Sequence, residues 1–271
     1  MFWNLKESSV ALENGKIDYA VFGRGKKPLV IIPGLTLRDV KGAGVSLALM
    51  YRIFARDYRV YVMDKNTVIP KGVTVFDLAN DTVNAMKALG ITNASLLGVS
   101  LGGMIAQNIA VEHPELVSKL VIGVSASRTN DTVLQAVNKW IDLAKSDNFG
   151  AIVEDMLYVM YSEKYRKQYG WMFPILSRFA KPKNKERFIR LAKACLTCDT
   201  YRKLENITCP TLVLGGSDDK IVTGKASLEI AEKLGCEIYM YEGLGHSAYE
   251  EASDFNTRIY SFLMGETVKN V

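Results

Sequence analysis

The sequence predicts an α/β protein: a mostly parallel eight-stranded sheet, helices on both faces of the sheet, and a helical cap inserted into the chain. Three observations carry this prediction. Short apolar runs alternate with helix-forming segments over residues 1–127 and again over 204–271, as in proteins built from βαβ units. The residues between, 128–203, show no convincing strand pattern. The pentapeptide GVSLG at 98–102 joins an apolar run to a helical one.

The first part of the predicted core contains six strands. Residues 8–23 alternate apolar and polar side chains across Asn14-Gly15, a pair that favours a hairpin turn. The continuously apolar run PLVIIPG at 28–34 is typical of a buried parallel strand. Further strands are expected at 58–64, 94–99 and 116–127.

Helices separate the strands. ALMYRIFAR at 48–56 has helical periodicity. Thr74 and Asp77 can form a capping box at the start of the next helix, and Gly90 can end it. Helices at 140–145, 149–162 and 185–198 make up the predicted cap, residues 128–203. Strands at 209–216 and 236–243 and helices at 225–235 and 251–265 complete the core, residues 1–127 and 204–271.

Length and composition indicate an ordinary globular protein. The 271 residues are 48% apolar and 23% charged, so the chain can bury a sizeable core. No apolar run approaches the roughly 18 residues of a membrane-spanning helix, so no membrane span is expected. The N-terminal residues lack a signal-peptide pattern, from which we expect a cytoplasmic location.

Positive charge is concentrated in the predicted cap. Residues 128–203 hold 15 basic and 8 acidic side chains, a net charge of +7 in a chain whose total is +5. Such a segment can attract an anionic substrate or surface, or its lysines can coat solvated helix faces; the second interpretation is favoured. No motif interleaves basic and aromatic residues, so no nucleic-acid partner is expected.

Two of the four cysteines, Cys195 and Cys198, have CxxC spacing, which metal and redox sites share. A zinc site needs further ligands, and this segment contains no histidine. The favoured interpretation is two small buried thiols on one helix. No motif in the chain requires a metal or a cofactor, so none is expected.

Ser100 is the candidate nucleophile. It lies in a strand–turn–helix context, which is what the nucleophile-elbow motif requires. Gly98, Gly102 and Gly103 leave room for a sharp turn, and the hydroxyl should project near a helix N-terminus that favours negative charge. A serine in a purely structural turn is the less favoured interpretation.

A serine hydroxyl needs a base, and the chain has only two histidines. His113 ends the helix that Ser100 begins, roughly 19 Å away at 1.5 Å per residue, so it is excluded. His246 lies in a loop after the last strand. Loops at the carboxyl ends of parallel strands gather over the same edge of the sheet, so His246 is the expected base.

The base in turn needs a carboxylate to orient it. Asp219, just after a strand, is preferred; Asp218 beside it is the alternative, and Asp131 a more distant one. The resulting chain order is serine, aspartate, histidine. The backbone N–H groups of Leu101 and Leu35 are the expected oxyanion donors, with Thr36 as an alternative to Leu35 through its N–H or hydroxyl.

With these motifs, the chain resembles α/β-hydrolase fold proteins over nearly its whole length, and in particular small bacterial esterases and 3-oxoadipate enol-lactonase-like proteins. In many members the acid turn is an aspartate followed by a basic residue, two apolar residues and a proline, and Asp219-Lys-Ile-Val-Thr resembles it, which favours Asp219 over Asp218. One departure is Pro33-Gly34, where many relatives carry His-Gly. The resemblance implies that the cap covers the active site.

Apolar and aromatic cap residues are therefore candidates for a substrate pocket above Ser100. The expected pocket residues are Met156, Met160, Tyr161 and Trp171, together with Thr36 of the core. Packing of these side chains between cap and sheet is the competing interpretation.

The sequence thus predicts a cofactor-independent serine hydrolase acting on a small carboxylic ester, thioester or lactone. An acyltransferase or carbon–carbon bond hydrolase with the same three residues is an alternative, as is a small-molecule binding protein with slow turnover. The sequence specifies neither the physiological substrate, the acyl length, the pathway nor the oligomeric state.

Overall fold

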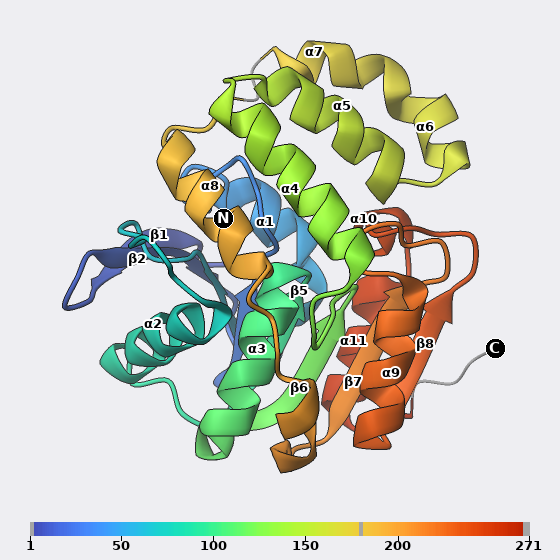
Figure 1. The fold of residues 1–271 in the computed structure, drawn as a ribbon. Coiled ribbons are helices and arrows are strands. Elements are labelled where there is room, and N and C mark those ends of the chain that lie inside the picture. The colour runs from blue at the N-terminus through green and yellow to red at the C-terminus, as the bar shows by residue number, and fades with distance from the viewer. Residues whose placement is uncertain (1–2, 179–180, 268–271) are drawn as a thin grey trace.

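A twisted sheet of eight strands forms the centre of the computed structural model, which describes residues 3–178 and 181–267 (Figure 1). The strands are β1 (Lys6–Ala11), β2 (Lys16–Phe22), β3 (Lys27–Ile32), β4 (Tyr58–Met63), β5 (Ala94–Val99), β6 (Val117–Gly123), β7 (Thr211–Gly216) and β8 (Glu237–Tyr241). Their spatial order is β1-β2-β4-β3-β5-β6-β7-β8. The β1–β2 and β2–β4 pairs are antiparallel, and all others are parallel. The predicted mostly parallel eight-stranded sheet is confirmed.

Helices cover both faces of this sheet. On one face lie α2 (Val75–Ala88), α3 (Leu101–Glu112) and α9 (Gly224–Leu234); on the other lie α1 (Gly44–Met50) and α11 (Phe255–Met264) (Figure 1). Alternate side chains of the central strands supply the two cores. In β3, Val30 and Ile32 pack with the first set of helices, whereas Leu29 and Ile31 pack with the second.

The helices of residues 128–203 lie together above the sheet in Figure 1. They are α4 (Asp131–Lys145), α5 (Phe149–Met160), α6 (Glu163–Tyr169), α7 (Phe173–Ser177) and α8 (Lys185–Cys195). Buried side chains of α4 and α8, such as Trp140 and Phe188, belong to the same apolar cluster as α3. An isolated bridge joins Arg128 to Asp199 at the base of this segment. None of the helices in the described ranges is long and apolar enough to cross a membrane.

The predicted ends of the helices are confirmed in part. Thr74 and Asp77 form the predicted capping box of α2, and Gly90 follows that helix with a positive φ. The single helix expected at 48–56 is instead α1 followed by a 3-10 turn at Arg52–Ala55. The tighter turn accompanies burial of both Phe54 and Tyr51, whose rings lie 6.4 Å apart. The last predicted helix, 251–265, corresponds to α11, and a short helix that was not predicted, α10 (Ala248–Glu251), precedes it.

Candidate active site

Ser100 connects β5 to α3 in a turn with almost no free space. Its φ of 54° and ψ of −120° lie in a region that non-glycine residues rarely occupy. A Cβ atom at Gly102 would overlap the carbonyl oxygen of Ile32 in β3, and one at Gly98 would overlap the backbone of Gly102. One at Gly103 would lie 2.6 Å from Ser125 Cβ. The three glycines thus let the first turn of α3 lie directly against the sheet and lift the Ser100 hydroxyl above it.

The structure brings His246 and Asp219 to this hydroxyl. His246 Nε2 lies 2.9 Å from Ser100 Oγ, and His246 Nδ1 lies 2.7 Å from Asp219 Oδ2. Both partners are buried, with exposed fractions of 2% for His246 and 6% for Asp219. The backbone N–H groups of Ile221 and Val222 donate to Asp219 Oδ1 at 2.8 and 3.0 Å. These bonds satisfy the second oxygen and hold the carboxylate in one orientation.

The competing residues lie elsewhere. Asp218 accepts a hydrogen bond from Ser217, and Asp131 is exposed at the start of α4. His113 follows the far end of α3 and faces Glu115. Of the carboxylates and histidines considered from the sequence, the structure therefore places only Asp219 and His246 in line with Ser100.

The backbone N–H groups of Leu35 and Leu101 flank Ser100. Leu101 is the first residue of α3, so its N–H has no helical carbonyl partner. The loop after β3 runs beside Ser100, since a Cβ at Gly34 would lie 3.1 Å from Ser100 Cβ. Over the described part of the chain, neither N–H donates to a protein acceptor. The hydroxyl of Thr36, by contrast, accepts a hydrogen bond from the Arg38 N–H at 3.1 Å.

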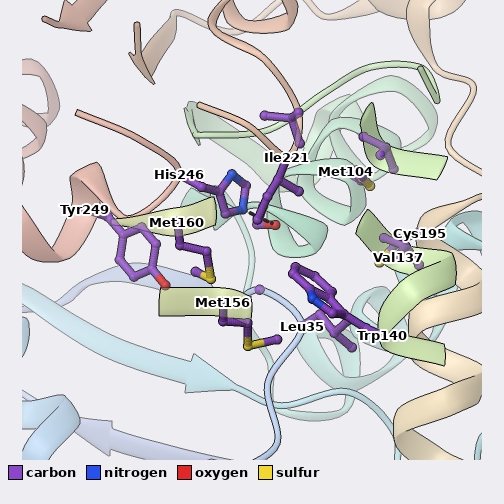
Figure 2. A pocket seen from close by; sticks show the side chains of 14 residues that line it. Leu35, Met104, Val137, Trp140, Met156, Met160, Cys195, Ile221, His246 and Tyr249 are labelled. Atoms are coloured by element: carbon purple, nitrogen blue, oxygen red, sulfur yellow. Dashed lines mark hydrogen bonds between the residues drawn. The ribbon is translucent and has the colours of Figure 1, made fainter. Parts of the chain in front are cut away.

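Two adjacent cavities lie between the sheet and residues 128–203. The inner cavity, about 40 Å³, includes Ser100 and His246. The outer cavity, about 490 Å³, follows the loop after β3. The two share Gly34, Leu35, Met156, Met160 and Tyr249. In Figure 2 the side chains of Met156 and Met160 lie between His246 and Trp140 on one side and Tyr249 on the other.

The expected pocket residues fall into two groups in the structure, those that line the cavities and one that does not. Thr36, Met156, Met160 and Tyr161 line the cavities. Trp171 does not; it lies in a 3-10 turn on the outside of the cap, and 69% of it is exposed. The tryptophan that lines the inner cavity is Trp140, which the sequence analysis did not select. It shares one face of α4 with Val133 and Val137, a spacing that marks a buried helical stripe.

The CxxC cysteines are buried, as expected, but only Cys195 belongs to α8; Cys198 follows the helix end. Each thiol donates to a backbone carbonyl, Cys195 to Leu191 and Cys198 to Ala126. Burial raises the pKa of both thiols to about 12, so both are protonated at neutral pH. No cluster of three or more metal-ligating side chains occurs within residues 3–178 and 181–267.

Comparison with known proteins agrees with this architecture. A model of the α/β-hydrolase fold family matches residues 27–253. The chain belongs to the α/β-hydrolase fold family. The curated relatives of this hydrolase are distant. A 2-hydroxy-6-oxo-6-phenylhexa-2,4-dienoate hydrolase of Comamonas testosteroni is 27% identical over 224 residues, 76% of this chain and 77% of that protein.

Solved structures share the fold. An α/β hydrolase from a Medee basin deep-sea metagenome library superposes with a TM-score of 0.85 and 22% identity, over 97% of this chain and 99% of that one. The enol-lactonase of Burkholderia xenovorans LB400 superposes with a TM-score of 0.80 and 19% identity, over 95% and 100%. At these identities the likeness concerns the fold, which is the one predicted from the sequence.

The contact of Gly102 with β3 predicts a specific loss of stability. Gly102→Ala should lower the free energy of unfolding by about 3 kcal/mol or more, because the new Cβ meets backbone that cannot move aside. Gly170→Ala is the matched control, since that glycine has helical φ and open space around it. Urea unfolding followed by circular dichroism measures both. Equal midpoints for the two variants would contradict the tight packing described for the turn.

Proposed function

We propose that this α/β hydrolase is a cofactor-independent serine hydrolase that cleaves a small carboxylic ester, thioester or lactone. The observation that carries the proposal is the continuous line from Ser100 Oγ through the His246 ring to Asp219, which ends at an apolar cavity. A serine, an imidazole and a carboxylate in this arrangement supply a nucleophile, a general base and the group that orients the base.

The reaction follows from the geometry. His246 Nε2 takes the proton of Ser100 as the hydroxyl attacks the substrate carbonyl. The N–H groups of Leu35 and Leu101 hold the oxyanion of the tetrahedral intermediate. Protonated His246, stabilised by Asp219, gives its proton to the departing alcohol or thiol, which leaves an acyl group on Ser100. Water activated by His246 then releases the acid.

The two cavities suggest which part of the substrate lies where. Every residue that lines only the inner cavity, apart from Ser100 and His246, is an apolar or thiol side chain at most 5% exposed: Met104, Val133, Val137, Trp140, Cys195, Ile221 and Val222. The outer cavity reaches the exposed residues Thr36, Arg38 and Glu250. The alcohol must leave while the acyl group is still bound to Ser100, so we assign the alcohol to the outer cavity and a short acyl chain to the inner one.

A carbon–carbon bond hydrolase is the second candidate function, and the Comamonas relative favours it. Both reactions would use the same three side chains, but the leaving group would be a carbon atom instead of an oxygen or a sulfur. Product analysis with esters and with vinylogous diketones separates the two. Addition of an alcohol acceptor to the same assay reveals acyl transfer.

Substitution of the catalytic residues tests the proposal directly. Ser100→Ala should lower kcat on an activated short-chain ester by about 10⁶-fold. Asp219→Asn should lower it by about 10⁴-fold, because the histidine would then be held in the wrong tautomer. Asp218→Asn is the matched control and should leave kcat essentially unchanged, since Asp218 contacts Ser217 and not His246. A loss below about tenfold in Ser100→Ala would refute the proposal.

The assignment of the inner cavity predicts a preference for short acyl chains. On p-nitrophenyl esters, kcat/KM should be highest for acyl chains of about two to four carbons, because the inner cavity is small and is walled by buried apolar side chains. Trp140→Ala should move the optimum to longer chains. Trp171→Ala, which removes the exposed tryptophan of the same cap, should leave the optimum in place. A shift in both variants, or in neither, would contradict the assignment of the acyl chain to the inner cavity.

A further inference from the structure

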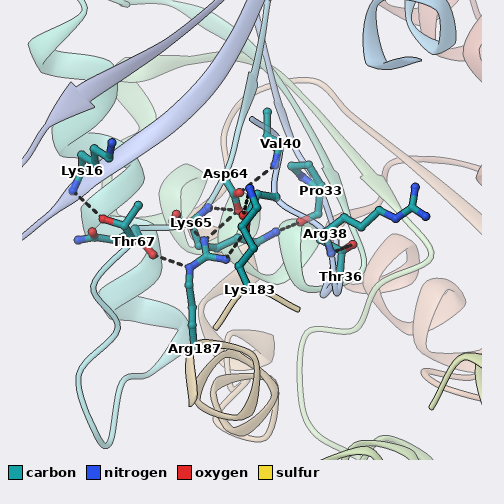
Figure 3. Close-up of polar contacts among 12 residues, drawn as sticks. Lys16, Pro33, Thr36, Arg38, Val40, Asp64, Lys65, Thr67, Lys183 and Arg187 are labelled. Carbon is teal, nitrogen blue, oxygen red and sulfur yellow. Dashed lines mark hydrogen bonds and ion pairs between the residues drawn. The ribbon is translucent and has the colours of Figure 1, made fainter. Parts of the chain in front are cut away.

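A buried lysine that the mechanism above does not use lies beneath the loop that carries Leu35. Lys65 is 4% exposed and follows the end of β4. Its ammonium Nζ donates to the carbonyl oxygens of Pro33 and Gly34, each at 2.6 Å (Figure 3). Burial of a lysine has a large desolvation cost. The residues that surround Lys65 must therefore compensate for its charge.

The register of the sheet explains why position 65 reaches this loop. Strands β3 and β4 are parallel neighbours in which Ile31 faces Val62, so both chains leave the sheet at the same edge. Asp64, the residue before Lys65, accepts a hydrogen bond from the Val40 N–H at 3.0 Å. Asp64 and Lys65, two consecutive residues after β4, thus form hydrogen bonds with both ends of the loop 33–40.

The contact with Gly34 bears directly on the proposed oxyanion hole. The Gly34 carbonyl and the Leu35 N–H belong to one peptide unit, and the described chain contains no cis peptide bonds. A trans peptide points its C=O and its N–H in opposite directions. A cation that holds the carbonyl on the β4 side therefore directs the N–H to the opposite side of the chain, within the peptide plane. It also polarises the peptide and strengthens that N–H as a donor.

We infer that Lys65 is the positioning residue of the oxyanion hole: its ammonium group fixes the Gly34–Leu35 peptide and so aims the Leu35 N–H at the developing oxyanion. This inference rests on the proposed function of Ser100 and Leu35. It assigns to Lys65 no contact with the substrate. Its effect is expected on the chemical step more than on substrate binding.

The charges around Lys65 come from its own strand end and from the cap. Asp64 Oδ1 accepts from the Lys65 N–H at 2.7 Å and from Arg187 of α8 at 3.1 Å. Arg187 also donates to the Lys65 carbonyl at 2.7 Å and lies 3.6 Å from Asp39. The thiol of Cys195, also on α8, completes the surroundings. Lys183, just before α8, also pairs with Asp39 at 3.3 Å. The cluster thus contains two carboxylates and three cations, and Arg187 connects it to α8.

These surroundings determine the protonation states of Asp64 and Lys65. Burial opposes ionisation of Asp64, but Lys65, Arg187 and two backbone N–H groups lower the pKa of that carboxyl. Burial, opposed mainly by Asp64, lowers the pKa of Lys65 to about 8. Lys65 is therefore cationic below that pH and becomes a neutral, weaker donor above it. If the ammonium aims the donor, kcat of the wild type falls as the pH rises through about 8.

A second lysine of this chain, Lys119, makes similar contacts far from Ser100 and serves as a comparison for Lys65. Lys119 of β6 also donates to two consecutive carbonyls, those of Phe262 at 2.8 Å and Leu263 at 3.1 Å. It lies four residues before Gly123, whose carbonyl accepts the Ser100 N–H, a separation of about 13 Å along a strand. The Phe262 and Leu263 carbonyls also accept from the Gly265 N–H and the Tyr58 hydroxyl, respectively. Lys119→Met therefore reports the general effect of losing a lysine that bonds two carbonyls, at a place remote from the oxyanion loop.

The experiment compares Lys65→Met, Lys65→Arg and Lys119→Met with the wild type. We measure kcat and KM on p-nitrophenyl butyrate from pH 6 to 10, the Ki of butylboronic acid, and the labelling rate of Ser100 by a fluorophosphonate. Lys65→Met should lower kcat by about 10- to 100-fold, less than outright loss of a donor. Its KM should stay nearly constant, and Ki should rise by about the same factor as kcat falls. Lys65→Arg should restore most of kcat and abolish the decline near pH 8, because arginine stays charged.

The outcomes distinguish a failure of the role inferred for Lys65 from a failure of the proposed function. Wild-type kcat and affinity for the boronic acid in a folded Lys65→Met protein, or equal effects of Lys65→Met and Lys119→Met, would overturn the role of Lys65. If Lys65→Met does not fold, the comparison of wild type with Lys65→Arg decides, since an unchanged alkaline limb in Lys65→Arg would refute the inference. A wild type that neither hydrolyses esters nor is labelled at Ser100 would refute the proposed function and this inference together.

Discussion

The close approach of α3 to β3 at residues 98–103 is the constraint on which the rest of the site depends. The helix can begin directly above the sheet only because no side chain stands between Gly102 and the Ile32 carbonyl. Ser100, at the top of this contact, is forced into a positive φ. The surrounding packing must offset that strain, which costs about 1–3 kcal/mol at such a residue. The same turn directs the first N–H groups of α3 toward the space above Ser100.

Parallel strands bring the remaining polar groups to that space. The ends of β3, β4, β5, β7 and β8 are followed by Leu35, Lys65, Ser100, Asp219 and His246, respectively. Each residue belongs to a different loop, yet all of these loops leave one edge of the sheet, as in other open α/β sheets. The cap contributes mainly apolar surface to the cavities, including Trp140 and Met156. In the proposed function, the reacting groups therefore come from loops that follow strands, and residues 128–203 contribute apolar walls of the cavities.

The positive charge of residues 128–203 also acquires a structural explanation. Several cations of this segment pair with carboxylates of the core: Arg128 with Glu229, Lys183 with Asp39, Arg187 with Asp64 and Lys203 with Glu112. Exposed pairs of this kind contribute little each, but in the Arg187–Asp64 pair the carboxylate is buried and the Arg187 side chain is only 14% exposed. No lysine or arginine of the segment lines either described cavity. These pairs connect residues 128–203 to the core at several points, which accounts for part of the positive charge of the segment.

The sequence was sufficient for the fold and for the three residues of the proposed catalytic line, for identifiable reasons. Ser100 stands in a motif whose glycines have a steric cause, and a chain with two histidines leaves little choice of base. Trp140 could have been found from its spacing with the other buried residues of α4. The exposure of Trp171 and the burial of Lys65 could not be predicted from the sequence. The residues around a tryptophan in a cap, or around a lysine after a strand, do not show whether that side chain is buried. The positions of Trp171 and Lys65 depend on how the cap folds back and on the β3–β4 register.

The most direct test of the central claim is a crystal structure with butylboronic acid bound. The account predicts a tetrahedral boron bonded to Ser100 Oγ, with one boronate oxygen about 2.7–3.1 Å from both the Leu35 and the Leu101 nitrogens. The butyl chain should extend into the inner cavity toward Trp140. A boronate that does not bond to Ser100, or whose oxygen faces away from these two N–H groups, would contradict the account.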